Sequence, residues 1–151
     1  MSRKQSVYLI GSLRNEVIPK LGVRLRAAGH EVFDDWHGAG PAADDEWQKY
    51  EKIRGRSYLE ALKGRAAQNT FDFDHRNLMR CEAAVLVLPA GKSGHLELGF
   101  MAGMGRKTYV LYQEEPERWD LMYKFADGVF IDQDELIHAL GTIEIDFFDN
   151  R

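Results

Sequence analysis

Cysteine is nearly absent from this chain, since Cys81 is the single thiol in 151 residues. One thiol cannot form an internal disulfide, so the sequence indicates a reducing compartment, and we expect a cytoplasmic location. Long apolar runs are missing as well, because no stretch approaches the roughly 20 residues that cross a bilayer. The apolar run near the N-terminus is also too short for a signal peptide. The sequence therefore predicts no contact with a membrane.

Basic runs and metal-ligand patterns are lacking too. The formal net charge is -4, and no run of lysine and arginine is present that could follow a nucleic-acid backbone. Because affinity for nucleic-acid polymers comes largely from neutralised phosphates, we expect no such polymer as a partner. The five histidines show no paired metal-ligand spacing. We therefore expect neither a metal ion nor a cofactor.

Strand and helix patterns alternate along the chain. With 44% hydrophobic and 29% charged residues, the composition is that of an ordinary folded protein, and the length suits one domain with its own core. Short apolar runs that end in glycine or polar loops predict strands, and apolar residues at helical spacing predict helices. We expect strands in residues 6–11, 30–36, 83–91, 107–112 and 127–131, and helices in 18–28, 44–68, 71–82, 94–105 and 132–140.

This alternation predicts an α/β protein over residues 1–151: a single Rossmann-like or flavodoxin-like domain with a mostly parallel sheet flanked by helices. Residues 36–68 are long for a connection, and they predict a helical cap insertion that is broken near Gly55 and Gly64. In such sheets, ligands bind beyond the carboxyl ends of the strands. That rule indicates the loops at residues 11–14, 34–38 and 91–97.

Glu97 lies between two leucines, shortly after the most apolar predicted strand. If Gly94 caps the following helix, Glu97 occupies its third position, where the helix dipole favours a carboxylate and keeps it ionised. This placement fits a carboxylate nucleophile, and it fits equally a first-turn charge without a chemical role. In the same helix, Gly99 and Gly103 are four residues apart, a spacing that allows close approach of another backbone.

Asp74 shares a predicted helix face with Phe71, Leu78 and Cys81. A buried carboxylate is costly unless it is paired or functional, and burial raises its pKa toward that of a proton donor. One ionised and one protonatable carboxylate are the groups that glycosidic bond cleavage uses. A helix that is rotated, or that starts later, would instead leave Asp74 in solvent. We expect Cys81 to pack in the core rather than to react.

Two glycine loops are candidates for ligand binding. The GKS sequence at residues 91–93 lacks the first glycine of a Walker motif, because that position is Leu86, and Gly11 lacks the partners of a dinucleotide fingerprint. Backbone N–H groups of either loop could still hold an anion, or the glycines could only make tight turns. The candidate side chains and loop positions are Tyr8, Gly11, Ser12, Arg14, Trp36, Lys92, Ser93 and Gly94. Packing roles for the two aromatic residues, and a plain surface charge for the arginine, are the competing interpretations.

Three segments together resemble the nucleoside 2-deoxyribosyltransferase superfamily, which includes the 2'-deoxynucleoside 5'-phosphate N-hydrolases. They are VYLIGSLR at residues 7–14, FDFDHRNLMRCEAAVLVLP at residues 71–89 and SGHLELGFMAG at residues 93–103. The resemblance covers roughly residues 7–131 in order, with a longer middle segment than in compact members. It implies a homodimer or a larger homo-oligomer in which a neighbouring subunit closes the site. The tail at residues 142–150 is a candidate for that contact.

The resemblance also implies roles for individual residues. Glu97 matches the glutamate that attacks the anomeric carbon and forms a covalent glycosyl-enzyme. Asp74 matches the aspartate that supports protonation of the leaving group, and Tyr8 matches the tyrosine that orients the nucleophile. The loop of Gly11, Ser12 and Arg14 matches the loop that meets a 5'-phosphate in the phosphohydrolase branch. Ahead of its glutamate that branch has small and hydroxyl residues, whereas this chain has GKSG.

The favoured hypothesis is therefore an enzyme that cleaves the N-glycosidic bond of a (2'-deoxy)nucleoside or its 5'-monophosphate, with transfer of the sugar to another base or to water. An NAD-type glycohydrolase is one alternative. A non-catalytic nucleotide-binding or sensing module is another. All three expect a small nucleoside or nucleotide as partner. The sequence leaves open the base, the sugar, the phosphorylation state and the choice between hydrolysis and transfer.

Overall fold

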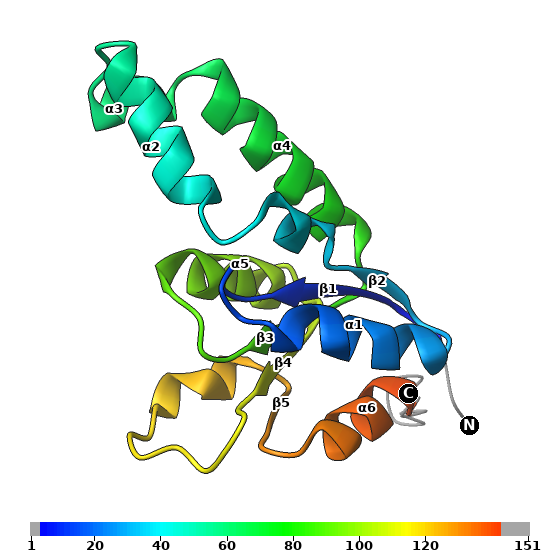
Figure 1. The fold of residues 1–151 in the computed structure, drawn as a ribbon. Helices are drawn as coiled ribbons and strands as arrows, with labels where there is room; N and C mark the ends of the chain where they lie inside the picture. The colour runs from blue at the N-terminus through cyan, green and yellow to red at the C-terminus, as the bar shows by residue number, and fades with distance from the viewer. Residues whose placement is uncertain (1–3, 143–151) are drawn as a thin grey trace.

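Five parallel strands in the order β2-β1-β3-β4-β5 form the sheet of this protein (Figure 1). The structure is a computed structural model, and it describes residues 4–142. All five strands lie within the segments expected from the sequence, and the α/β architecture is confirmed. The strands are β1 (Ser6–Ile10), β2 (Glu31–Phe33), β3 (Ala83–Val87), β4 (Lys107–Leu111) and β5 (Gly128–Phe130).

Helices cover both faces of the sheet. The core on one face is formed with α1 (Val17–Ala27) and α6 (Gln133–Gly141), and the core on the other with α4 (Arg65–Arg80) and α5 (Lys92–Gly103). Alternate side chains of a strand point to opposite faces, so Leu9 packs in the first core and Ile10 in the second. Because both faces are covered, the central strands β1 and β3 are buried at every position.

The strand order places β1 and β3 side by side. β2 lies on the outer side of β1, whereas β4 and β5 lie on the outer side of β3, so the strand order reverses direction between β1 and β3. A crevice forms at such a switch point, beyond the carboxyl ends of the two strands. Gly11 lies there and is held tightly: a Cβ at this position would be 2.8 Å from Ile18 Cδ1 and 3.0 Å from the Val87 carbonyl oxygen. A glycine thus keeps the loops after β1 and β3 close together.

A helical segment lies between β2 and β3. It contains the 3-10 helix η1 (Asp35–Ala39), α2 (Ala43–Ile53), α3 (Tyr58–Leu62) and the start of α4, and α2 and α3 project away from the sheet (Figure 1). The breaks fall at the two glycines expected from the sequence. Gly55 has a φ of +73° between α2 and α3, and Gly64 is the N-cap of α4. The insertion and the single-domain boundaries of residues 1–151 remain predictions.

Several element boundaries differ from the sequence-based prediction. The second strand ends at Phe33 rather than at residue 36, because the chain turns into η1 at Asp35. The helix expected over residues 71–82 begins at Arg65, directly after the Gly64 cap, so residues 65–68 belong to α4 rather than to a separate insertion helix. The 3-10 helix η2 (Leu121–Phe125) was not predicted, because it buries no side chain and so leaves no hydrophobic pattern.

The close approach that the spacing of Gly99 and Gly103 allows does not occur within the described chain. An added Cβ at either glycine would have no atom within 4 Å, because neither faces a neighbouring element. The close approach lies instead at Gly94, where an added Cβ would be 3.2 Å from both Ile10 Cγ2 and Leu86 Cδ1. This contact packs the first turn of α5 onto β1 and β3. Among residues 4–142, no helix is long and apolar enough to span a membrane.

Candidate active site

A cavity of about 820 Å³ opens at the carboxyl ends of β1 and β3. Its walls come from the loop after β1, from η1 and α2, from α4 and from the start of α5. Every position selected from the sequence as a candidate site residue lines this cavity: Tyr8, Gly11, Ser12, Arg14, Trp36, Asp74, Lys92, Ser93, Gly94 and Glu97. Tertiary folding therefore collects into one place residues that are up to 89 positions apart.

Glu97 lies in the second turn of α5, not in the first. The helix is capped by Gly91 and begins at Lys92, so the expected cap at Gly94 is wrong, and Glu97 is three residues deeper in the helix than predicted. The electrostatic influence of a helix end fades within its first turn. Burial instead dominates and raises the pKa of Glu97 to about 7, with a smaller increase from the negative charge of Asp74. The expectation that the helix end keeps Glu97 fully ionised is therefore wrong.

Tyr8 holds the Glu97 carboxylate. Its hydroxyl donates a hydrogen bond of 2.9 Å to Glu97 Oε2, and this bond partly offsets the effect of burial on the Glu97 pKa. The tyrosine is buried in β1, and its ring lies 4.9 Å from the ring of Phe33. Burial and the two nearby carboxylates raise the pKa of Tyr8 far above its ordinary value. The phenol therefore remains a hydrogen-bond donor, and Glu97 Oε1 accepts no hydrogen bond from any described residue.

Asp74 reaches the same cavity from α4. It is half-buried, and burial raises its pKa from 3.8 to about 6. Leu78 and Cys81 are buried on the same helix face, as the sequence predicts, but Phe71 is 61% exposed and stacks on His75. The apolar stripe ends there because the first half of α4 has left the sheet. Burial also raises the pKa of Cys81 to about 11, so this thiol packs in its protonated form.

The loop after β1 forms the floor of the cavity. Ser12 Oγ accepts a hydrogen bond of 3.1 Å from the Arg14 backbone N–H, which closes a tight turn. Arg14 lines the cavity and is also largely exposed, with an ion pair of 3.6 Å to Asp45 on α2. Because both partners are in solvent, this pair contributes little stability. The guanidinium is thus available to an anionic ligand.

Sequence reasoning missed Asn15, which fixes this loop. Its side-chain amide lies 3.4 Å from the carbonyl oxygens of Val87 and Leu88, and its Oδ1 accepts a bond from the Val17 N–H. The residue is buried and joins the end of β3 to the start of α1. An asparagine two residues before a helix is the kind of signal that could have found it.

Trp36 acts both as a packing residue and as a wall of the cavity. Its indole N–H donates a hydrogen bond of 2.7 Å to the Leu9 carbonyl, beyond the point where β1 and β2 stop pairing. Its ring contacts both cores. The other wall residues on η1, α2 and α4 were not selected from the sequence, because no pattern in the chain marked them as ligand-binding residues. These include Asp35, Asp44, Asp45, Asn69, Thr70 and Phe73.

The two raised carboxyl pKa values make a prediction about stability. Between the ordinary pKa of 4.5 and the folded pKa of about 7, Glu97 binds more protons in the folded protein than in the unfolded chain. The free energy of unfolding must therefore fall as pH rises through this window, and Asp74 acts in the same direction between 3.8 and about 6. At about 1.4 kcal/mol per pKa unit, Glu97→Gln is expected to stabilise the protein by roughly 3 kcal/mol at pH 8, and by much less near pH 5.

Urea unfolding of the wild type and of Glu97→Gln at these two pH values measures this difference. Glu114→Gln removes an exposed carboxylate outside the cavity and serves as the control. Equal stabilities of the wild type and Glu97→Gln at pH 8 would show that the buried carboxylate carries no such cost.

Two solved structures share the fold of this chain. A 2-deoxyribosyltransferase from Bacillus psychrosaccharolyticus aligns with a TM-score of 0.60 at 18% identity, covering 87% of this chain and 90% of the other. A CMP N-glycosidase from Clostridium botulinum aligns with a TM-score of 0.53 at 15% identity, covering 89% of this chain and 97% of the other. No protein-family model matches the sequence, and a search of curated proteins finds no match. The comparisons confirm the resemblance seen in the sequence at the level of the fold.

Proposed function

We propose that this protein cleaves the N-glycosidic bond of a (2'-deoxy)nucleoside or its 5'-monophosphate through a covalent bond between the sugar and Glu97. The observation that carries the proposal is the geometry of three side chains: Glu97 accepts a hydrogen bond from Tyr8 and shares one cavity with Asp74. The two solved structures with this fold are a deoxyribosyltransferase and an N-glycosidase, and their activities support the same reaction class.

In the first step, ionised Glu97 attacks the anomeric carbon through Oε1, the oxygen that Tyr8 leaves free. The bond from that carbon to the base nitrogen breaks, and its electron pair leaves with the base. The Asp74 carboxylic acid supplies a proton to the base, directly or through one water. In the second step, water or another base attacks the anomeric carbon, its proton passes to the Asp74 carboxylate, and the bond to Glu97 breaks to release the ionised glutamate. Two displacements on one carbon give net retention of configuration.

The cavity suits a ligand of this class. Its volume of about 820 Å³ lies in the range of small-molecule sites, which is roughly 300–1,000 Å³. Lys92 and Ser93 begin α5 next to the Gly91 cap, where the open N–H groups of a helix favour an anion such as a 5'-phosphate. Trp36 offers an aromatic wall against which a base can pack. The proposal includes assembly into a homo-oligomer. Its candidate contact is the segment at residues 142–150, of which only Thr142 belongs to the described residues.

A substrate panel tests the proposal. The protein is incubated with nucleosides, nucleoside 5'-monophosphates and NAD, with and without a free acceptor base. Chromatography measures the released base, and mass spectrometry detects a sugar adduct on the protein. Free base without an acceptor identifies a hydrolase, and an exchanged nucleoside identifies a transferase. Nicotinamide release from NAD alone, or tight nucleotide binding without product and unchanged by Glu97→Gln, would replace the proposal with one of the alternatives.

Tyr8→Phe makes a narrower prediction. Loss of the donor to Oε2 removes the contact that lowers the Glu97 pKa, so that pKa rises further. A charge-assisted hydrogen bond contributes roughly 1.5–3 kcal/mol, so kcat/KM near pH 7 should fall by about tenfold or more. Because Glu97 has the higher pKa of the two carboxyls, its further rise should move the alkaline limb of the pH profile upward by about one unit. Tyr58→Phe, at an exposed position on α3, serves as the control, and an unchanged alkaline limb in Tyr8→Phe would contradict the assigned role.

A further inference from the structure

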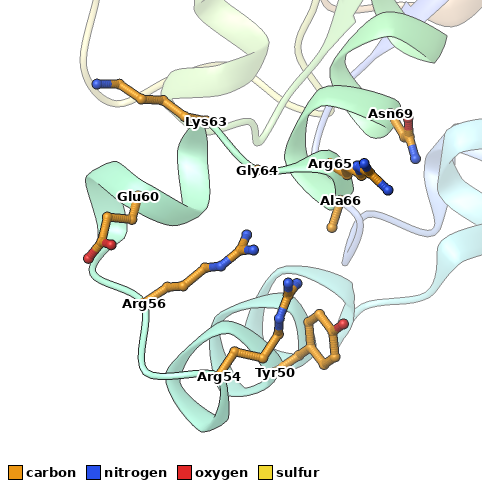
Figure 2. A pocket seen from close by; sticks show the side chains of 9 residues that line it. All are labelled: Tyr50, Arg54, Arg56, Glu60, Lys63, Gly64, Arg65, Ala66 and Asn69. Carbon is orange, nitrogen blue, oxygen red and sulfur yellow. The ribbon is translucent and has the colours of Figure 1, made fainter.

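A second cavity of about 960 Å³ lies within the helical segment, between α2, α3 and the start of α4 (Figure 2). Three arginines from separate parts of the chain line it: Arg54 at the end of α2, Arg56 in the following loop and Arg65 at the start of α4. Figure 2 shows Arg54 and Arg56 extending toward the segment at residues 64–66, whereas Lys63 and Glu60 point outward. The proposed reaction uses none of these residues.

A buried carboxylate positions two of these arginines. Glu51 is only 2% exposed, and its two oxygens lie 3.4 Å from Arg54 and 3.4 Å from Arg56. Glu51 and Glu60 together offset two of the four cationic side chains at this cavity, which leaves it with an excess of positive charge. Arg54 is further held 5.1 Å above the ring of Tyr50, which also lines the cavity. The guanidinium groups are thus fixed in place before any ligand arrives.

Arg65 and the start of α4 add to the positive potential. Arg65 forms no ion pair with any described residue. The α4 N-terminus has no side-chain cap and no acidic residue in its first turn, so its first N–H groups remain open. Arg56 lies close against the cap residue: a Cβ on Gly64 would be 2.5 Å from Arg56 Nη1. In this arrangement the Arg56 guanidinium therefore lies against the start of α4.

We propose that this cavity binds a phosphate-bearing small molecule. Guanidinium groups match the geometry of phosphate oxygens with paired hydrogen bonds, and the open N–H groups of α4 complete such a site. Three arginines are few for a nucleic-acid strand, whose binding neutralises many phosphates. The volume and the single aromatic side chain, Tyr50, suit a ligand of nucleotide size.

Asn69 lines both this arginine cavity and the Glu97 cavity. Arg65 and Asp74 are nine positions apart on α4, which corresponds to about 13 Å along the helix axis. The phosphate therefore has two sources: the distal part of an extended substrate, or a separate effector molecule. Both present the same phosphate chemistry to the arginines.

Binding of inorganic pyrophosphate to the full-length protein tests the site without relying on turnover. Titration calorimetry gives the affinity, and amide resonances in an NMR titration locate the ligand. We expect the Arg65 and Ala66 amides to shift.

Arg65→Gln should weaken binding by about tenfold, because it removes a charge-assisted contact. The double variant Arg54→Gln/Arg65→Gln should weaken pyrophosphate binding further. Arg56 remains in this variant, so the buried Glu51 carboxylate keeps an ion-pair partner. Arg76→Gln, an exposed arginine on the same helix that lines neither cavity, is the matched control and should change affinity less than twofold.

Two further arms identify the source of the phosphate. If the substrate supplies it, Arg65→Gln raises the KM of a nucleoside 5'-triphosphate but not that of the unphosphorylated nucleoside. If an effector supplies it, pyrophosphate still binds when a nucleoside saturates the Glu97 cavity, and KM values do not change. Either result supports the proposal.

Three results would overturn the proposal. They are an absence of binding, equal affinities in Arg65→Gln and Arg76→Gln, and a loss of binding only in Arg14→Gln/Lys92→Gln, which would place the phosphate in the Glu97 cavity. Because the readout is direct binding, it remains decisive even if the proposed glycosidic reaction fails its own test.

Discussion

Glu97→Gln is expected to lower kcat/KM by a factor of at least about 10⁴ on whichever substrate the panel identifies, because it removes the atom that bonds to the sugar. The glutamine side chain has nearly the same shape, and its amide oxygen can still accept the hydrogen bond from Tyr8. Substrate affinity should therefore change by less than about tenfold. Steady-state kinetics and direct binding measurements separate these two effects.

The matched control is Glu114→Gln, at an exposed position outside the Glu97 cavity, and it should retain wild-type kinetics. A mass-spectrometric search for the sugar adduct adds a second readout, because the wild type should trap it and Glu97→Gln should not. Turnover by Glu97→Gln within tenfold of the wild type would remove Glu97 from the mechanism. The reaction would then have to proceed without a covalent glycosyl-enzyme.

Asp74→Asn is expected to lower kcat by a factor of about 10²–10³, which is typical when a general acid is lost. The wild type should show a bell-shaped pH profile with its maximum between about 6 and about 7, since the pKa of Asp74 is raised to about 6 and that of Glu97 to about 7. The two limbs belong to the pair of carboxyls, because the groups interact. Asp74→Asn should lose the alkaline limb and keep the acidic one.

Leaving-group chemistry distinguishes proton donation from a purely structural role of Asp74. A substrate whose base departs without protonation should recover most of the lost rate in Asp74→Asn, whereas a structural defect would slow all substrates alike. Asp72→Asn, an exposed position on the same helix, is the control. If the alkaline limb persists in Asp74→Asn, another group supplies the proton.

Most of the fold was predictable because its signals are local. The uninterrupted apolar run at β3 and the apolar spacing of α1 each follow from burial in a covered parallel sheet, and all five strands were placed. The errors concern boundaries. The turn at Asp35 and the helix start at Lys92 were missed, because these ends depend on where a glycine can pack or a chain can turn.

The candidate site was predictable in its members but not in its electrostatics. Glu97 was selected from its place after a buried strand, yet its pKa was predicted in the wrong direction, because burial in the folded cavity raises it and the helix end is too far away to offset this. The position of Asn15 before a helix is a local signal that was not used, whereas Asn69 belongs to no motif, and only the tertiary structure shows that it lines both cavities.

The sequence by itself determined the order of strands and helices, the glycines that interrupt the helical segment, and the residues available for chemistry. These features depend on periodicity and residue type, which act over a few neighbouring positions. Tertiary structure alone decided that Tyr8, Asp74 and Glu97 meet in one cavity, and that burial raises both carboxyl pKa values. Desolvation and hydrogen bonding depend on the atoms that surround a group in space, and the order of residues in the chain does not specify them.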